Sequence, residues 1–334
     1  MKIDTRLGEL GNAAASARTI EEAGYDGAWS SEVSHDPFLP LAVAASTTSS
    51  LELGTSIAVA FARSPMTLAY TAHDLQGFSQ GRLLLGLGSQ VKAHVTRRFS
   101  MPWGKPALQM KEFILAMRAI WQSWEDGTPL EFTGEHYQHT LLTPYFVPEA
   151  HGYGPPRVLL AGVGEGMTRV AGETADGFLC HGFTTARYIK EKTLPALEEG
   201  RRRAGKTMEG FEIVGAPFFV TGTDEELAAG VPKAREQVAF YASTPAYRAV
   251  LELHGWGDLG QELTTMSKKG KWKEMGELID DDVLHAFAVV APTSELAARL
   301  GERYGSIVTR LPFNPPKSAD ADAARELVAS LRKV

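Results

Sequence analysis

The sequence predicts an α/β fold, a closed (β/α)8 barrel of the TIM-barrel class with insertions, in one domain that spans residues 1–334. Short apolar runs alternate with longer segments of helical periodicity along nearly the whole chain, which favours a parallel α/β fold. Eight such units suit a closed barrel better than an open sheet. No stretch rich in Pro, Gly or Ser divides the chain into two parts.

Each expected strand is a short apolar run, and the third is the longest and the richest in β-forming residues. In chain order the expected strands cover residues 3–6, 26–30, 51–59, 82–87, 157–160, 177–180, 211–220 and 306–311.

Helices are expected between these strands, and several carry their own start signals. Ser64-Pro65 is typical of an N-cap followed by proline in the first turn, and Thr223-x-x-Glu226 is a capping box. The expected helices cover residues 11–23, 65–78, 106–124, 166–174, 185–203, 224–241, 244–254 and 293–304, and another begins at residue 39. The stretches 126–156 and 240–285 exceed ordinary loop length, so we expect them to be insertions on the barrel.

The composition excludes several classes of function. With 34 basic and 40 acidic residues the net charge is −6, which argues against general affinity for nucleic acid or for an anionic membrane. Cys180 is the only cysteine, so neither an internal disulfide nor a cysteine-based zinc site is expected, and no metal site is predicted. No signal peptide and no membrane-spanning run is visible, so we expect a soluble, cytoplasmic protein.

Functional side chains of such a barrel lie at the carboxyl ends of the strands. After the second expected strand come Glu32, His35 and Asp36, which are suited to acid–base chemistry. An ordinary loop in which Asp36 caps the next helix would explain the same residues.

Two glycine-rich turns also follow expected strands. Gly86-x-Gly88 is no dinucleotide fingerprint, because Val91 occupies the third glycine position. Gly162-x-Gly164-x-Gly166 opens a helix, where free N–H groups and the helix dipole favour an anion such as a phosphate. A plain flexible turn is the alternative.

Four segments together resemble one known family: EAGYDGAW (22–29, continuing to Glu32), LGTSI (53–57, continuing to Pro65), GRLLLGLG (81–88) and AGETADG (171–177). In this order and spacing the chain resembles the luciferase-like monooxygenase superfamily. Within it the chain is most similar to an actinobacterial branch of deazaflavin (coenzyme F420)-dependent oxidoreductases.

The resemblance implies a luciferase-like barrel, a homodimer, and a flavin-type cofactor at the carboxyl ends of the strands. It also implies a non-proline cis peptide at Ser56–Ile57 that forms a bulge behind the cofactor ring. The cofactor contacts that carry over are Ser56, Ile57, Ala58, Gly88, Ser89, Gln90 and Val91, with Ala161, Gly162, Val163, Gly164, Gly166 and Met167 at the phosphate.

The sequence departs from some members of the family. Val33 and Val91 stand where the deazaflavin-dependent sugar-phosphate dehydrogenases place a His and a catalytic Glu, which argues against sugar-phosphate oxidation. Ser89 stands where bacterial luciferase holds the FMN phosphate with an Arg, which weakens the FMN interpretation.

We therefore expect an F420-dependent oxidoreductase that transfers a hydride between the deazaflavin C5 and a small organic substrate. Glu32 and His35 are the candidates for proton transfer, and Phe61, Arg63 and Trp103 for the substrate side. The alternatives are an FMN-dependent luciferase-like monooxygenase and a non-catalytic flavin- or deazaflavin-binding protein. The sequence leaves the substrate and the direction of reaction open.

Overall fold

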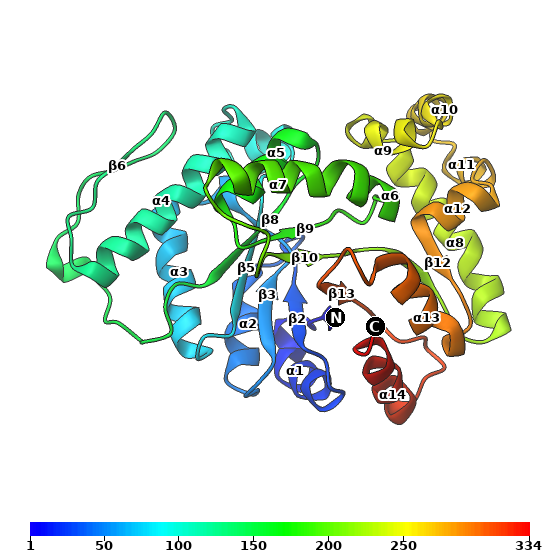
Figure 1. The fold of residues 1–334 in the computed structure, drawn as a ribbon, viewed down its shortest axis with the longest axis horizontal. Helices are drawn as coiled ribbons and strands as arrows, with labels where there is room; N and C mark the ends of the chain where they lie inside the picture. The colour runs from blue at the N-terminus through cyan, green and yellow to red at the C-terminus, as the bar shows by residue number, and fades with distance from the viewer.

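The computed structural model describes residues 1–334 and contains the expected closed barrel (Figure 1). Eight parallel strands pair in chain order, and the last pairs with the first. They are β1 (Lys2–Arg6), β2 (Gly27–Ser30), β3 (Glu52–Thr55), β5 (Leu83–Gly88), β8 (Arg157–Ala161), β9 (Gly177–Leu179), β10 (Glu212–Val214) and β13 (Arg310–Pro312). Each of the eight expected strands overlaps one of these.

Helices surround the barrel because each offers it one apolar face. The longest, α4 (Pro106–Asp126), buries residues at helical spacing along most of its length. The others around the barrel are α1 (Ala13–Glu22), α2 (Phe38–Ala45), α3 (Pro65–Phe78), α5 (Glu165–Thr174), α7 (Leu194–Arg203), α13 (Thr293–Tyr304) and α14 (Ala321–Leu331). None of the helices is both long and apolar enough to cross a bilayer.

One expected strand, residues 211–220, is divided in two. Its first part is the barrel strand β10, whereas its second part, β11 (Phe218–Val220), leaves the barrel and pairs with β12 (Ala288–Val290). Pro217 stands at the break, and its lack of an N–H prevents a continuous ladder. The long unbroken strand was therefore a wrong prediction.

Between β11 and β12 the chain forms a lobe of five helices at the right of Figure 1, with an apolar cluster of its own. Its elements are α8 (Asp224–Ala242), the short turn η6 (Pro245–Tyr247), α9 (Arg248–Leu253), α10 (Gly257–Lys268), α11 (Trp272–Glu277) and α12 (Asp281–Phe287). At the opposite side a hairpin of β6 (Phe132–Thr133) and β7 (Gln138–His139) projects from the barrel.

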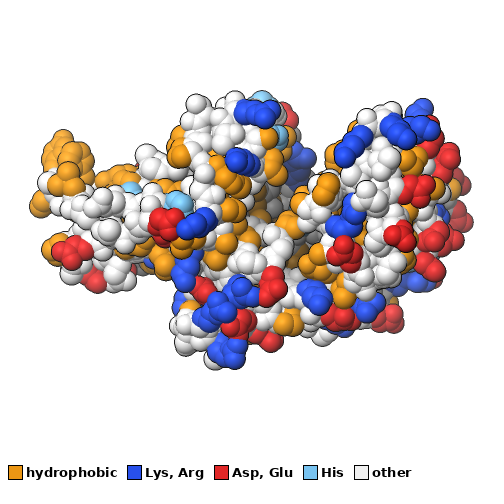
Figure 2. Space-filling model, turned by 90° about the horizontal axis from the view of Figure 1, so that it is seen from above, with side chains coloured by type: hydrophobic (Ala, Val, Ile, Leu, Met, Phe, Trp, Pro, Cys, Tyr) orange, Lys and Arg blue, Asp and Glu red, His pale blue; other side chains and the backbone are white.

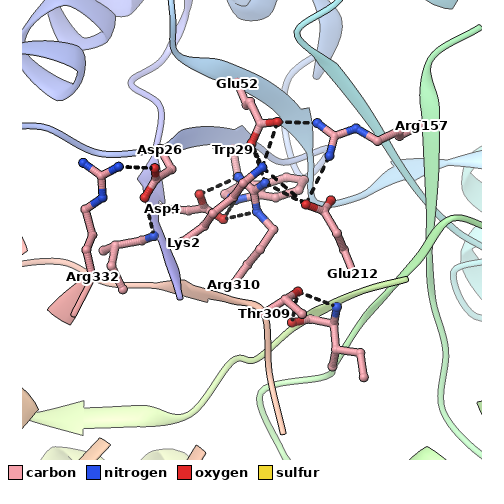
Figure 3. Close-up of polar contacts among 12 residues, drawn as sticks. Lys2, Asp4, Asp26, Trp29, Glu52, Arg157, Glu212, Thr309, Arg310 and Arg332 are labelled. Atoms are coloured by element: carbon pink, nitrogen blue, oxygen red, sulfur yellow. Dashed lines mark hydrogen bonds and ion pairs between the residues drawn. The ribbon is translucent and has the colours of Figure 1, made fainter. Parts of the chain in front are cut away.

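A network of charged side chains closes the amino end of the barrel (Figure 3). Arg310 is fully buried and donates from Nε and Nη2 to the two Asp4 oxygens, at 2.8 and 2.7 Å. Its Nη1 also contacts Glu52 at 2.5 Å and Glu212 at 3.3 Å. Lys2 and Arg157 pair with the same two glutamates, so three cations face three anions.

Candidate active site at the carboxyl end of the barrel

The third strand is interrupted at the carboxyl end of the barrel. β3 ends at Thr55, the peptide between Ser56 and Ile57 is cis, and pairing with β5 resumes in β4 (Ala58–Val59). The resulting bulge is held from the loop after β2, because Ser56 N–H donates to Ser30 O at 2.7 Å and Glu32 N–H donates to Ile57 O at 3.2 Å. The cis peptide that the resemblance implies is thus confirmed.

Two glycines of β5 make room for this bulge. A Cβ on Gly86 would lie 1.8 Å from the Thr55 carbonyl oxygen, and one on Gly88 would lie 2.9 Å from Ile57 Cδ1. Thr55 Oγ1 donates to Gly86 O at 2.7 Å and fixes the two strands at this point. Only glycine permits so close an approach of side chain and backbone.

Glu32 and Arg63 brace the chain that leaves the bulge. Glu32 Oε2 accepts from Val59 N–H at 2.7 Å and from Arg63 Nη1 at 2.6 Å. The Arg63 guanidinium also lies 3.5 Å from Asp36 Oδ2 and 5.3 Å from the Phe38 ring centroid. Oε1 of Glu32 takes part in none of these contacts, so one carboxylate oxygen stays available.

The other residues expected near the substrate differ in their exposure to solvent. His35 is exposed, and Asp36 accepts from Phe38 N–H at 2.8 Å, which confirms the capping interpretation of Asp36. Phe61 is only 2% exposed, so its side chain belongs to the core, and its ring meets Trp103 edge-on at 5.7 Å. Of this pair only the partly buried Trp103 reaches the surface.

The loop after β5 has an unusual backbone at Gln90, whose φ is +60°. The Gln90 side chain accepts from Val91 N–H at 3.2 Å, and Ser89 Oγ donates to Gln90 O at 3.0 Å. Val91 is 58% exposed. Arg98 donates to Val33 O and so ties this loop to the one after β2.

The glycine-rich turn joins β8 to α5, as the sequence predicts. Gly164 precedes the first residue of α5 with a φ of +81°, and a Cβ on it would meet no atom within 4 Å. The N–H groups of the first turn have no helical partner. Gly162 lies under Met167, which is buried, so the turn is packed on one side and open on the other.

A small cavity opens at this turn and is lined in part by residues that the sequence analysis did not select. Figure 2 shows the hollow from above, between the barrel helices and the α8–α12 lobe. His181, directly after β9, and Tyr247, in η6, line the cavity and approach each other to 3.1 Å between Nε2 and Oη. The position of His181 after a barrel strand was a usable signal, whereas nothing local marked Tyr247.

Burial changes the pKa of both groups. It lowers the pKa of His181, so the imidazole is neutral near pH 7. Burial, and to a lesser degree Tyr241, raises the pKa of Tyr247, so its hydroxyl keeps its proton.

The model of the luciferase-like monooxygenase family matches residues 3–310. The chain belongs to this family. It is 52% identical to the uncharacterized protein Rv1360 of Mycobacterium tuberculosis, over 93% of this chain and 92% of that protein.

Solved structures of the same fold include coenzyme F420 enzymes. The F420-dependent tetrahydromethanopterin reductase from Methanopyrus kandleri matches with a TM-score of 0.75 and 21% identity, covering 98% of this chain and 96% of that one. An F420-dependent secondary alcohol dehydrogenase in complex with an F420–acetone adduct matches with a TM-score of 0.74 and 18% identity, covering 99% of both chains.

Proposed function

We propose that this protein is an F420-dependent oxidoreductase that transfers a hydride between the deazaflavin C5 and a small organic substrate. The observation that carries the proposal is the close packing of the chain after β3 against Gly86 and Gly88, at the end of the barrel where such enzymes react. F420-dependent enzymes among the relatives and structural neighbours support the same chemistry.

The residues present fit a deazaflavin at two places. Ser56, Ile57 and Ala58 would hold the ring, together with Gly88 and the loop of Ser89, Gln90 and Val91. The turn from Ala161 to Met167 would take the phosphate, because Gly164 leaves its open side clear. When bound, the deazaflavin supplies a carbon that gives or accepts a hydride.

The protein's own part is to orient the substrate and to hold a proton. We assign the proton to Glu32 and His35, which border the loop beside the bulge; Oε1 of Glu32 is its reactive atom, since Oε2 is already bound by Arg63 and Val59. Arg63 acts through Glu32 by holding it in place. Trp103, supported by Phe61, lies on the substrate side.

Binding titrations of the purified protein test the proposal. We expect F420 to bind with micromolar or tighter affinity, followed by quenching of its fluorescence, and FMN to bind much more weakly. Preference for FMN would move the protein to the oxygenase branch of the family. Failure of both cofactors to bind would contradict either enzymatic function.

Turnover is examined next, with a matched pair of variants. Glu32→Gln keeps an acceptor for Val59 N–H but removes the carboxylate, whereas Glu135→Gln removes an exposed carboxylate that pairs only with Lys105. We expect Glu32→Gln alone to slow hydride transfer, with F420 binding retained in both.

We also propose a homodimer, which light scattering tests.

A further inference from the structure

The cavity beside the glycine-rich turn lies outside the barrel axis. Side chains of a strand alternate between the two faces of the sheet. Leu179 of β9 belongs to the small cluster inside the barrel, whereas its neighbours Phe178 and Cys180 belong to the core outside it and line the cavity. A ring held over the Ser56–Ile57 bulge would therefore reach this cavity only with its side arm.

The walls of the cavity are polar in places but carry no ionised side chain. Its lining contains no Lys, Arg, Asp or Glu. The polar groups there are the turn itself, the hydroxyls of three threonines, and the side chains of His181, Tyr188 and Tyr247. In the adjoining surface hollow Glu165 pairs with Arg169, and the other cation there is Lys192, which does not line the cavity itself.

The hydrogen bonds of His181 determine which proton the pair offers. Phe183 N–H donates to His181 Nδ1 at 3.0 Å, so this nitrogen carries a lone pair. The proton of the neutral ring is then on Nε2, which donates to Tyr247 Oη at 3.1 Å. Because that oxygen already accepts this bond, the Tyr247 O–H is free to donate to another acceptor. The two rings are also stacked, 4.4 Å apart, which limits the freedom of the phenol.

We propose that the His181–Tyr247 pair is a neutral donor that makes this cavity select a singly charged phosphodiester over a doubly charged phosphate monoester. The inference rests on the proposed function, because F420 carries its phosphate as a diester and FMN as a monoester. A helix N-terminus supplies about half a positive charge and neutral donors add hydrogen bonds, so a cavity lined without a cation compensates a single negative charge better than a double one. Tyr247 would contact the phosphate, and His181 would position its hydroxyl.

The experiment compares four probes, each followed by fluorescence. They are F420, its precursor Fo (the same ring and ribityl chain without the phosphate and the acidic tail), FMN and riboflavin. Binding of Fo tests the proposed function alone, since Fo has no phosphate. In the unmodified protein we expect F420 to bind far more tightly than Fo. We expect the affinity for FMN to be only slightly higher than the affinity for riboflavin.

Tyr247→Phe keeps the ring and removes the donor. We expect it to weaken F420 binding about tenfold, the typical effect of losing a hydrogen bond to a charged group, and to leave Fo unchanged. The acidic tail of F420 is present when F420 is titrated into the variant and into the unmodified protein, so its contribution cancels from the ratio of these two affinities. Tyr241→Phe is the matched control. The ring centroids of Tyr241 and Tyr247 are 6.1 Å apart, but Tyr241 does not line the cavity.

Val163→Arg supplies the missing cation at the partly exposed tip of the turn. We expect it to raise FMN affinity about tenfold while riboflavin stays unchanged, because an arginine pairs with a phosphate dianion. The selectivity inference is overturned if the ratio of the FMN affinity to the riboflavin affinity is as large as the ratio of the F420 affinity to the Fo affinity. It is also overturned if Tyr247→Phe leaves F420 binding unchanged or weakens Fo equally. Failure of Fo to bind would instead contradict the proposed function on which the selectivity inference rests.

Discussion

The amino ends of the barrel strands meet in a network of ion pairs, whereas their carboxyl ends border glycine turns and a cavity. Lys2, Glu52, Arg157, Glu212 and Arg310 are each the first residue of a strand, and they surround Asp4 with net zero charge (Figure 3). At the other end of the same barrel, Gly86 and Gly88 let the neighbouring chain approach closely, and Gly164 leaves the turn before α5 open. The difference separates a closed end that stabilises the fold from an open end at which we propose that the cofactor binds.

The largest expected effect is at the closed end. Arg310→Met would leave the buried Asp4 and the partly buried Glu52 and Glu212 without this partner, so we expect a loss of about 3–5 kcal/mol in unfolding free energy. Urea denaturation measures it. The control is Arg332→Met, because Arg332 is half exposed and pairs with Asp26 at 2.9 Å; it should cost less than about 1 kcal/mol. A loss of less than about 1 kcal/mol in Arg310→Met as well would show that the network is dispensable.

The pH dependence of stability sharpens the same comparison. Burial alone would raise the pKa of Glu52, but Arg310, Lys2 and Arg157 outweigh it and lower the pKa from 4.5 to about 2. The folded protein therefore binds fewer protons at Glu52 than the unfolded chain. This stabilisation, on the order of 3 kcal/mol, is complete above the unfolded pKa and is lost as the pH falls toward the folded one.

Urea midpoints measured from about pH 6 down to about pH 3 should therefore decline, and Glu52→Gln should flatten the decline. If the variant and the unmodified protein lose stability in parallel, other carboxylates are responsible for the acid sensitivity.

A smaller effect is expected from glycines at the open end. Gly86→Ala places a methyl group 1.8 Å from Thr55 O, so the strands must separate, at a cost of about 1–3 kcal/mol. Gly166→Ala is the matched change in the first turn of α5, where the nearest atom lies 3.9 Å away. In a helix this change should stabilise, by up to about 1 kcal/mol. Thermal unfolding of both variants checks the difference, which would vanish if the bulge were not packed against β5.

The smallest expected effect is on the reactivity of Cys180, whose thiol lies in the wall of the cavity. Burial raises the pKa of Cys180 to about 12, so its thiol stays protonated in the native protein. We expect Ellman's reagent at about pH 8 to label it far more slowly than in the urea-unfolded chain. Rapid native labelling would mean that the cavity wall opens in solution.

Much of the fold was predictable because its signals are local. The alternation of apolar runs with helical periodicity located all eight barrel strands, and the capping box at Thr223 marked the start of α8. The sequence also indicated the turn at Gly162 and Gly164, because glycines before a helix form a short-range pattern. The family resemblance added the cis peptide.

Tertiary structure alone decided the contacts between distant residues. Arg310 and Asp4 are 306 positions apart and meet only because the last strand closes on the first. His181 and Tyr247 are 66 positions apart and meet because β11 leaves the barrel and carries the lobe back over β9. No local pattern encodes such pairs, since the free energy that joins them depends on burial and charge compensation, which exist only once the chain has folded.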